Sequence, residues 1–528
     1  MQIRSYDDLD FPLAWRRVLS WAQGGGIDLP DRLPFEVLSR LYGSDGPRPA
    51  PEHHLSPITL VMSSKKSGTA RPFTRLNSLD LTLYQALVDK LAPDIERALP
   101  ARDTVFAARQ SLGNETRAFA GTPGRAHFQD RIQTIFSSAS RRHRYAITAD
   151  VAGYFLHVRI DELEHRIYAA SSQVAVVRDL IDLLRGWQLL GVEGLPQGVQ
   201  ASRPLGNLYL LPVDTLLASR RIAYVRWIDD WVIAAPGFHS AREIQDEVEK
   251  CLYGIGLTLA ADKTGIVRAT TAVEDSVDAK ARLARIKRAR QQASQDALAE
   301  ALAFSEYPPD EEDLPDPGEL DLEATVEHYE ALLATLENDD LPRGFRPMVT
   351  EILRDLGSVR HAHALDRISR LLERAPDLTG AATRYLATVA QGALGEVETI
   401  FSDLLDADRF SREYEKLELC HSALSLPMRR APKLTRPFGE WALEDPHELV
   451  RARALLAWGA QSAKNDFSVA DAFWVRGTSA WRPYALVAIQ SKDRAARNRR
   501  YDKWSGDGRF LGRLARALKS NNFGWRKL

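Results

Sequence analysis

Cysteine is almost absent from this sequence. Only Cys251 and Cys420 occur among 528 residues, which excludes a disulfide scaffold, an iron–sulfur protein and a cysteine-rich zinc domain. The sequence also has no run of about 18 apolar residues, so no membrane-spanning helix is predicted. The first residues, MQIRSYDDLDFPLAW, place acids and a proline before any apolar stretch, unlike a signal peptide. We therefore expect a cytoplasmic protein with no membrane partner.

An excess of charge of one sign is lacking as well. The chain has 70 lysines and arginines against 71 aspartates and glutamates, for a formal net charge of −1. The charge is unevenly distributed, however, because residues 310–323 contain eight acids and no base, whereas residues 481–528 contain 13 bases and three acids. The basic end also contains aromatic residues, which can stack on bases while arginines contact phosphates. A solvated basic helix with core aromatics is the alternative, and the balanced total excludes neither.

The hydrophobic pattern divides the chain into three regions. Residues 1–275 mix strand-like runs with helical segments. Residues 276–345 contain a basic helix and then an acidic, proline-rich linker. In residues 346–528 apolar positions recur three and four residues apart, as on one helix face. The predicted fold class is therefore α+β in the first region, followed by an all-α bundle or HEAT-like solenoid.

The sharpest local feature is the pair of adjacent acids Asp229 and Asp230, between the apolar runs VRW and WVIAA. Neighbouring residues of a strand point to opposite faces. A tight hairpin at this pair can lift both carboxylates to one edge of a sheet, where oxygen ligands can hold a divalent cation. A surface turn between two strands is the plainer alternative.

Two further features precede this pair. Asp150 ends the apolar run YAITAD, and a Gly-Leu-Pro-Gln-Gly loop at residues 194–198 precedes a helix predicted from about Ser202. Taken singly, they indicate a strand cap and a turn. Two divalent cations about 4 Å apart need several carboxylates, and together they stabilise the attacking and leaving oxygens of phosphoryl transfer. A third carboxylate that meets the pair would therefore indicate this chemistry.

In this order, the three features resemble the palm of reverse transcriptases. Asp150 matches the aspartate of motif A, residues 194–214 match motif B, and residues 227–230 match motif C, which is usually Tyr-x-Asp-Asp. The segment GLTLAADKT resembles motif D, with Lys263 at its lysine. Trp227 departs from the usual tyrosine, and no Phe-Leu-Gly primer grip follows motif D.

A fifth segment, KKSGTARPF, resembles the fingers segment that grips the incoming triphosphate. The resemblance implies that Lys65, Lys66 and Arg71 bind the nucleotide. Arginine can hold phosphate oxygens bidentately, and lysine binds them as a point charge. Solvated loop bases are the alternative. The resemblance extends over roughly residues 55–268.

The resemblance also implies roles in the palm. Asp150 and Asp229 are expected to be the main Mg²⁺ ligands, with help from the Val151 carbonyl and support from Asp230. Mn²⁺ is the alternative ion, and oxygen ligands suit both. The acids and Lys263 form the expected catalytic set, in which Lys263 is a candidate proton donor to the leaving pyrophosphate or a plain surface lysine.

Two further residues are expected to contact the nucleotide. Phe155 falls where reverse transcriptases place an aromatic steric gate against the ribose 2′-hydroxyl, and a core phenylalanine is the alternative. Gln197 is expected to contact the incoming nucleotide.

The fold implied by the resemblance is a right-hand polymerase core of fingers and palm over residues 1–275. A basic helix and an acidic linker over 276–345 and a HEAT-like helical domain over 346–528 follow. A palm followed by a long helical region is similar to the bacterial abortive-infection and unknown-group defence-associated reverse transcriptases.

That resemblance implies antiphage defence by a DNA polymerase that takes dNTPs, makes a DNA product and works as a homo-oligomer. Synthesis in this group can be untemplated or primed by a protein tyrosine. The candidate tyrosines of the helical region are Tyr385, Tyr414, Tyr484 and Tyr501. The alternatives are a retron- or maturase-like enzyme that copies a specific noncoding RNA, and a nucleic-acid-binding scaffold with a vestigial palm.

Overall fold

The computed structural model describes residues 1–23, 33–65, 68–109, 123–137, 142–276, 317–337, 341, 345–405, 410, 412–427, 429–478, 480–507 and 509–520. The chain forms two compact units. The first comprises Met1–Val61 and Pro72–Val277, and the second comprises Met62–Arg71 and Asp278–Leu528. Within the described residues, no helix is long and apolar enough to cross a membrane.

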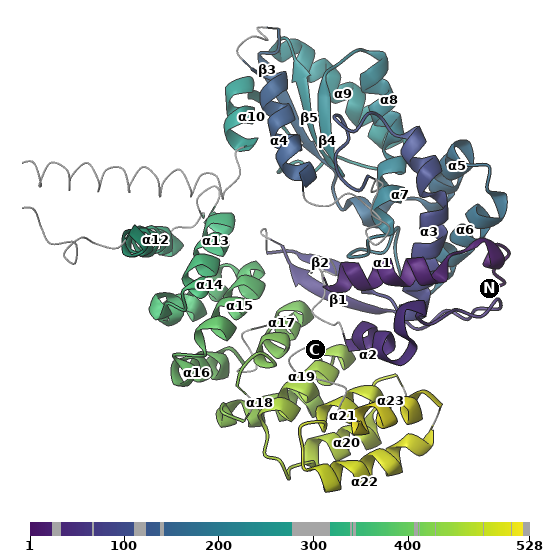
Figure 1. The fold of residues 1–528 in the computed structure, drawn as a ribbon. Coiled ribbons are helices and arrows are strands. Elements are labelled where there is room, and N and C mark those ends of the chain that lie inside the picture. The colour runs from purple at the N-terminus through teal and green to yellow at the C-terminus, as the bar shows by residue number, and fades with distance from the viewer. Residues whose placement is uncertain are drawn as a thin grey trace, which may run out of the picture. The chain divides into compact units, whose positions relative to one another are not determined.

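The first unit contains a four-stranded antiparallel sheet with the strand order β4-β5-β3-β6. Its strands are β3 (Tyr145–Asp150), β4 (Tyr224–Trp227), β5 (Asp230–Ala235) and β6 (Gly265–Arg268). A separate hairpin pairs β1 (Thr59–Ser64) with β2 (Ala70–Arg75). The strand-like runs of the sequence are thus confirmed as the two central strands, β3 and β5, and their neighbour β4 (Figure 1).

The described part of the first unit also contains helices, some of which lie against this sheet (Figure 1). They are α1 (Phe11–Gln23), α2 (Leu33–Tyr42), α3 (Ser78–Ala98), α4 (Pro123–Ile135), α5 (Ile160–Ala170), α6 (Val174–Leu189), α7 (Ser202–Tyr209), α8 (Leu211–Ser219), α9 (Phe238–Gly254) and α10 (Ala269–Ser276). The helix predicted from about Ser202 is confirmed as α7.

Side chains alternate across the sheet, as strand geometry requires. Ile147 and Ala149 of β3 belong to the main core, together with Trp231 of β5. Ala146 faces a smaller core, which includes Phe128 of α4. Helix α9 contacts β3 and β5, while α4 contacts β4 and α10 contacts β3 and β6. Both faces of the sheet therefore pack against core residues.

Residues 62–71, the tip of the β1–β2 hairpin, belong to the second unit, and the regular secondary structure of its other described residues is helical. Its helices are α12 (Pro317–Leu333), α13 (Phe345–Ser358), α14 (Ile368–Arg374), α15 (Thr379–Val389), α16 (Leu394–Leu405), α17 (Glu413–Ala423), α18 (Thr435–Glu444), α19 (Glu448–Gln461), α20 (Ser468–Arg476), α21 (Arg482–Ala488), α22 (Arg494–Trp504) and α23 (Arg509–Lys519).

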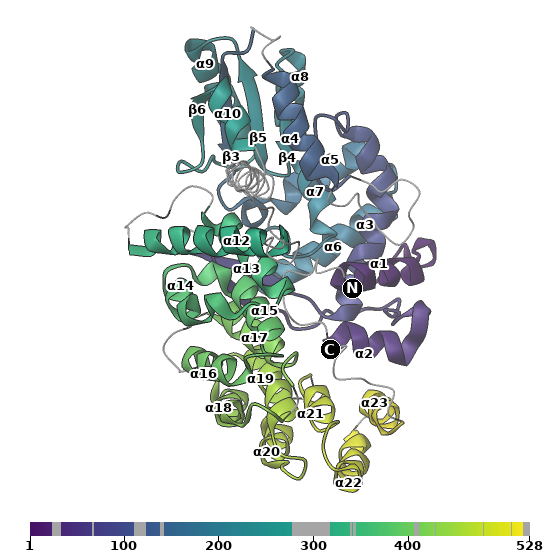
Figure 2. The same cartoon turned by 60° about the vertical axis from the view of Figure 1, so that its left-hand side comes forward.

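These helices form two layers. In one layer α13, α15, α17, α19, α21 and α23 each contact the next helix named, and in the other α14, α16, α18 and α20 do the same. Figure 2 shows the layers side by side. Within each layer a helix therefore packs on the helix two places along the chain.

The acidic stretch at 310–323, predicted as a linker, ends in a helix. Helix α12 begins at Pro317, so the linker prediction is wrong for residues 317–323. Proline is favoured at the first position of a helix, where its missing N–H leaves no bond unmade. The same helix buries Thr325, Tyr329 and Leu332, and this packing stabilises it. The basic helix predicted around 280–290 lies outside the described residues.

Candidate active site

The register of β3 on β5 sets Asp150 opposite Asp230. Trp227 of β4 also pairs with Asp230, so Ile228 and Asp229 form a two-residue turn between β4 and β5. The hairpin predicted from the WIDDW segment is therefore confirmed. Its acids come to one end of the sheet, and Asp150 reaches the same end from a distant part of the sequence.

The turn itself is strained. Ile228 has a φ of 56°, a backbone conformation that a β-branched residue adopts only when its surroundings impose it. The Ile228 carbonyl accepts a hydrogen bond of 2.7 Å from Nη1 of Arg226. The buried side chain of Arg226 therefore fixes the backbone that carries Asp229 and Asp230.

Lys263 reaches Asp150 through the segment that precedes it. The Ala152 N–H donates to the Thr258 carbonyl (2.9 Å) and the Ala260 N–H donates to the Asp150 carbonyl (2.8 Å), so this segment lies beside the end of β3. Lys263 Nζ lies 2.6 Å from Asp150 Oδ2, with the lysine side chain 58% and the aspartate side chain 11% exposed. The structure thus brings the expected proton donor and the first acid together.

The charge of Lys263 is stabilised by this environment. Partial burial acts to lower the pKa of its ammonium group, but the hydrogen bond and charge of Asp150, with the charges of Asp230 and Asp229, raise the pKa above its ordinary value. Lys263 is therefore protonated at neutral pH, which is the state that a proton donor requires.

The glycine loop packs against Phe155. Phe155 lies in a short 3₁₀ helix, Tyr154–His157, after β3 rather than on the strand itself, and is half-buried. Its carbonyl accepts a hydrogen bond of 2.8 Å from the Leu195 N–H. Gly194 has a φ of 61°, and a Cβ there would collide with the Phe155 carbonyl oxygen. Glycine is thus required for this approach.

Gln197 is half-buried in the same loop. Its carbonyl accepts a hydrogen bond of 3.0 Å from the Thr74 N–H of β2. This bond joins the glycine loop to the base of the β1–β2 hairpin within the first unit.

Lys65 and Arg71 belong to the second unit, as part of the hairpin tip at residues 62–71. Lys65 is half-buried and Arg71 is exposed. The structure therefore does not unite them with the acids in one unit. Lys66 lies outside the described residues.

The hairpin tip is held by residues at the start of α17. Arg412 Nη1 donates to Ser64 Oγ (2.8 Å) and to the Thr69 carbonyl (2.9 Å). The Met62 N–H donates to Glu413 (3.0 Å) and the Ser64 N–H donates to Glu415 (3.1 Å). Two N–H groups and a carbonyl of the tip's backbone are therefore bonded to charged side chains of the same unit.

Trp227, at the position where motif C usually has tyrosine, packs against helix α4. Its ring lies 5.9 Å from that of Phe128 of α4, at 62°, and it borders the smaller core. An aromatic edge-to-face contact of this kind stabilises packing, so the ring anchors the end of β4 to α4.

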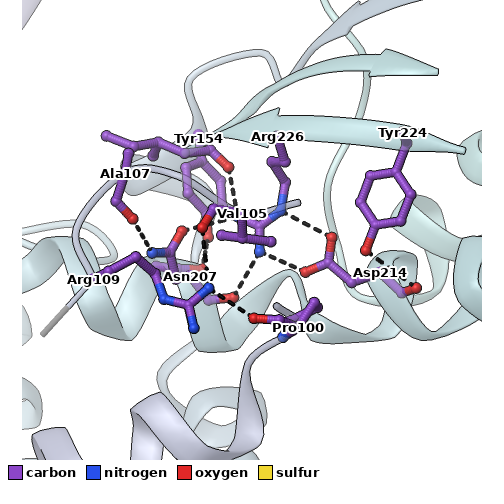
Figure 3. A network of polar contacts seen from close by, with 11 residues as sticks. Pro100, Val105, Ala107, Arg109, Tyr154, Asn207, Asp214, Tyr224 and Arg226 are labelled. Atoms are coloured by element: carbon purple, nitrogen blue, oxygen red, sulfur yellow. Dashed lines mark hydrogen bonds and ion pairs between the residues drawn. The ribbon is translucent and has the colours of Figure 1, made fainter. Parts of the chain in front are cut away.

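A buried polar network below the turn was missed by the sequence reasoning (Figure 3). Arg226 and Asp214 form an ion pair of 2.5 Å in which both side chains are 0% exposed. Asn207 joins them through a hydrogen bond of 2.9 Å from Arg226 Nη1. The available signal was a charged residue inside each of two apolar runs, YVRW and LYLLPVD.

Residues 63–292 match the sequence model of one protein family, described as reverse transcriptase (RNA-dependent DNA polymerase). The chain carries a reverse transcriptase domain. No curated protein matches the chain. Among solved structures, the chain is similar to a telomerase from Candida albicans in complex with a TWJ fragment of telomeric RNA, with 10% identity, a TM-score of 0.27 and coverage of 66% of each chain. The chain thus spans just under two thirds of that telomerase chain.

Reverse transcriptase domains use divalent metal ions, and the carboxylates of Asp150, Asp229 and Asp230 are of the ligand type that such ions take. Within the part of the chain that the structure describes, no group of three or more His, Cys, Asp or Glu side chains is placed to hold a metal ion. The ammonium group of Lys263 lies against Asp150, so this carboxylate has a cationic partner from the chain itself. Carboxylate oxygens at the end of β3 and in the adjoining turn are the hard ligands that Mg²⁺ and Mn²⁺ prefer.

We predict that Lys263→Met tightens Mn²⁺ binding in the absence of nucleotide by roughly two- to tenfold. The substitution removes a cation that competes for the Asp150 carboxylate. Electron paramagnetic resonance of free Mn²⁺ measures the affinity. Lys250→Met is the control, because Lys250 pairs with Asp246 on the exposed face of α9. Unchanged or weaker binding by the Lys263 variant would show that the lysine does not compete.

Proposed function

We propose that this chain is an RNA-directed DNA polymerase that joins dNTPs at a site formed by Asp150, Asp229 and Asp230. The observation that carries the proposal is the pairing of Asp150 with Asp230, inside a segment that matches the reverse transcriptase family. Lys263 on Asp150 supports it, since the motif that supplies the lysine approaches the acid that the mechanism needs.

The proposed site uses a divalent metal, Mg²⁺ with Mn²⁺ as the alternative, held by the three aspartates and the Val151 carbonyl. When bound, such ions neutralise the charge of the phosphates and stabilise the attacking and leaving oxygens. In the proposed reaction the primer 3′-hydroxyl gives its proton to water and its oxygen attacks the α-phosphorus, while the bond between that phosphorus and the oxygen of the leaving pyrophosphate breaks. The Lys263 ammonium group then supplies a proton to the pyrophosphate.

The remaining residues are proposed to select and hold the nucleotide. Phe155 is the proposed steric gate, and the hydrogen bond to its carbonyl fixes the backbone from which the ring extends. Gln197 is proposed to contact the nucleotide from the glycine loop. Lys65 and Arg71, with Lys66, are proposed to bind its triphosphate from the hairpin tip.

We predict that Asp150→Asn and Asp230→Asn each lower dNTP incorporation by roughly a thousandfold, because a metal ion supplies several kcal/mol of transition-state stabilisation. Incorporation of labelled dNTPs on an RNA template, and without added template, measures the loss. Melting temperature should stay near that of the unchanged protein, since ligands rather than packing are removed. Asp161→Asn is the matched control, because Asp161 is 76% exposed and pairs only at the surface with Arg185.

Two alternatives have distinct outcomes in the same assay. A nucleic-acid-binding scaffold predicts no incorporation by the unchanged protein under either condition. A retron- or maturase-like enzyme predicts incorporation that depends on one specific RNA, which sequencing of the co-purified nucleic acid would identify.

We further propose that the polymerase acts in antiphage defence as a homo-oligomer, with the two-layered helical stack as a HEAT-like repeat domain. The support is the combination of a reverse transcriptase domain with a long helical unit in one chain. Helical stacks of this kind offer extended surfaces for nucleic acid or protein partners.

We predict that phage plating efficiency falls in cells that express the unchanged chain and returns to the empty-vector value when Asp229→Ala and Asp230→Ala are combined. The reason is that defence by this route requires DNA synthesis. Equal protection by both chains, at equal protein levels, would favour the scaffold alternative instead.

Protein priming is the proposed route to untemplated DNA, and burial ranks the candidate tyrosines. Tyr385, Tyr484 and Tyr501 are at most 2% exposed. The Tyr385 hydroxyl donates to the His361 carbonyl (2.7 Å), and burial raises its pKa to about 12. Tyr414 is half-buried, so it is the proposed primer among the four.

We predict that Tyr414→Phe removes DNA from the protein band on a denaturing gel, because the hydroxyl that would carry the first nucleotide is lost. Tyr501→Phe is the control, since its hydroxyl is buried and donates to the Leu486 carbonyl (3.1 Å). DNA that stays attached to the Tyr414 variant would contradict this assignment, and peptide mapping would then locate the true attachment site.

A further inference from the structure

A charged residue lies fully buried directly before the Asp229–Asp230 turn. Arg226 of β4 is 0% exposed, as are Asp214 of α8 and Asn207 of α7. Removing an arginine and an aspartate from water costs free energy that their mutual attraction offsets only with favourable geometry. An apolar pair would fill the same space, so packing alone does not require these charges.

The guanidinium group of Arg226 uses its donors on three different elements. Nε and Nη2 donate to the two carboxylate oxygens of Asp214, at 3.0 and 2.5 Å. Nη1 donates to Asn207 Oδ1 at 2.9 Å and to the Ile228 carbonyl at 2.7 Å. The group is therefore a rigid planar fork that joins α7 and α8 to the turn.

The partners of Arg226 are themselves fixed. Asn207 Nδ2 donates to the Ala107 carbonyl at 2.7 Å, and the Arg226 N–H donates to the Thr104 carbonyl at 2.8 Å. Figure 3 shows Asn207 and Asp214 pointing toward Arg226, and Ala107 beside Asn207. Arg226 is thus held through its backbone N–H and through the side chains of Asp214 and Asn207, in addition to its hydrogen bond to the turn.

The Ile228 carbonyl belongs to the peptide group that enters Asp229. Because that group is planar, a hydrogen bond to its oxygen fixes the direction of the N–Cα bond of Asp229. Ile228 has its φ at 56°, and such a strained conformation persists only where neighbouring groups impose it. The Arg226 hydrogen bond is a group of this kind.

We propose that Arg226, held by Asp214 and Asn207, is a positioning residue that sets the Ile228–Asp229 peptide and thereby the Asp229 and Asp230 carboxylates for metal binding and catalysis. This inference rests on the proposed polymerase function for its kinetic part. Its metal-binding part can be tested whether or not the protein synthesises DNA.

The test combines Arg226→Met with Asp214→Leu, which replaces the ion pair by apolar groups of similar volume. Such a replacement preserves stability in other buried pairs, so the melting temperature is expected to stay near that of the unchanged protein. Mn²⁺ affinity is expected to fall about tenfold or more, and kcat to fall by roughly 10- to 100-fold with little change in the KM for dNTP.

A second variant, Arg226→Lys, keeps the buried charge but cannot bridge Asp214, Asn207 and Ile228 at once. The matched control is Arg453→Lys. Arg453 is 0% exposed, as Arg226 is, but it lies in α19 of the second unit. Values per folded molecule are compared, so a general cost of losing a buried arginine cancels.

Weaker Mn²⁺ binding and lower kcat in the Arg226 variants, with the Arg453 variant unchanged, would support the inference. A stable double variant with unchanged Mn²⁺ affinity would overturn it. If the double variant fails to fold, equal losses in Arg226→Lys and Arg453→Lys would overturn it as well. If the unchanged protein makes no DNA, the polymerase proposal fails, and Mn²⁺ affinity alone decides the positioning role.

Discussion

The pairing of β3 with β5 is the constraint on which the proposed site depends. Antiparallel partners lie directly opposite each other, so the register that pairs Tyr145 with Ala235 also pairs Asp150 with Asp230. A slip of β3 by one residue would turn Asp150 to the other face of the sheet. The β3 side chains of the main core would then face the smaller core, and those of the smaller core would face the main core. The apolar alternation that buries Ile147 on one face and Ala146 on the other therefore also determines where the acids meet.

Two charged side chains, Arg226 and Lys263, contact the turn and the acid that the sheet places at one end. The sheet places the ends of its strands, but a two-residue turn with a strained Ile228 needs further support. Arg226 supplies a donor to that turn from below, while Lys263 approaches Asp150 from the segment after α9. Arg226 is fully buried and its charge is compensated by Asp214, whereas Lys263 is largely exposed and can exchange its partner. The two therefore suit different tasks, the first in holding backbone and the second in proton transfer.

Local patterns in the sequence were enough to predict the hairpin at Asp229 and Asp230 and the helix from Ser202, whereas the meeting of Asp150 with the pair was implied by the resemblance to the reverse transcriptase palm. Strand period, turn residues and motif order carry those features. The Arg226–Asp214 pair escaped prediction because it depends on which helix packs beside which strand. Asp214 ends the segment that matches motif B, but that match does not indicate a partner for it. The helix that starts at Pro317 escaped for a related reason, since buried Thr325, Tyr329 and Leu332 outweigh an acidic, proline-rich composition.

The central claim is that the acids at the ends of β3 and β5 form one metal-dependent polymerase site. Crystals grown with Mn²⁺ and a non-hydrolysable dNTP, measured at a wavelength where manganese scatters anomalously, test it most directly. We expect an anomalous peak bounded by the carboxylates of Asp150 and Asp229, with the nucleotide phosphates beside it and Lys263 displaced from Asp150. A nucleotide-bound structure whose manganese lies elsewhere, with the Lys263–Asp150 ion pair intact, would contradict it.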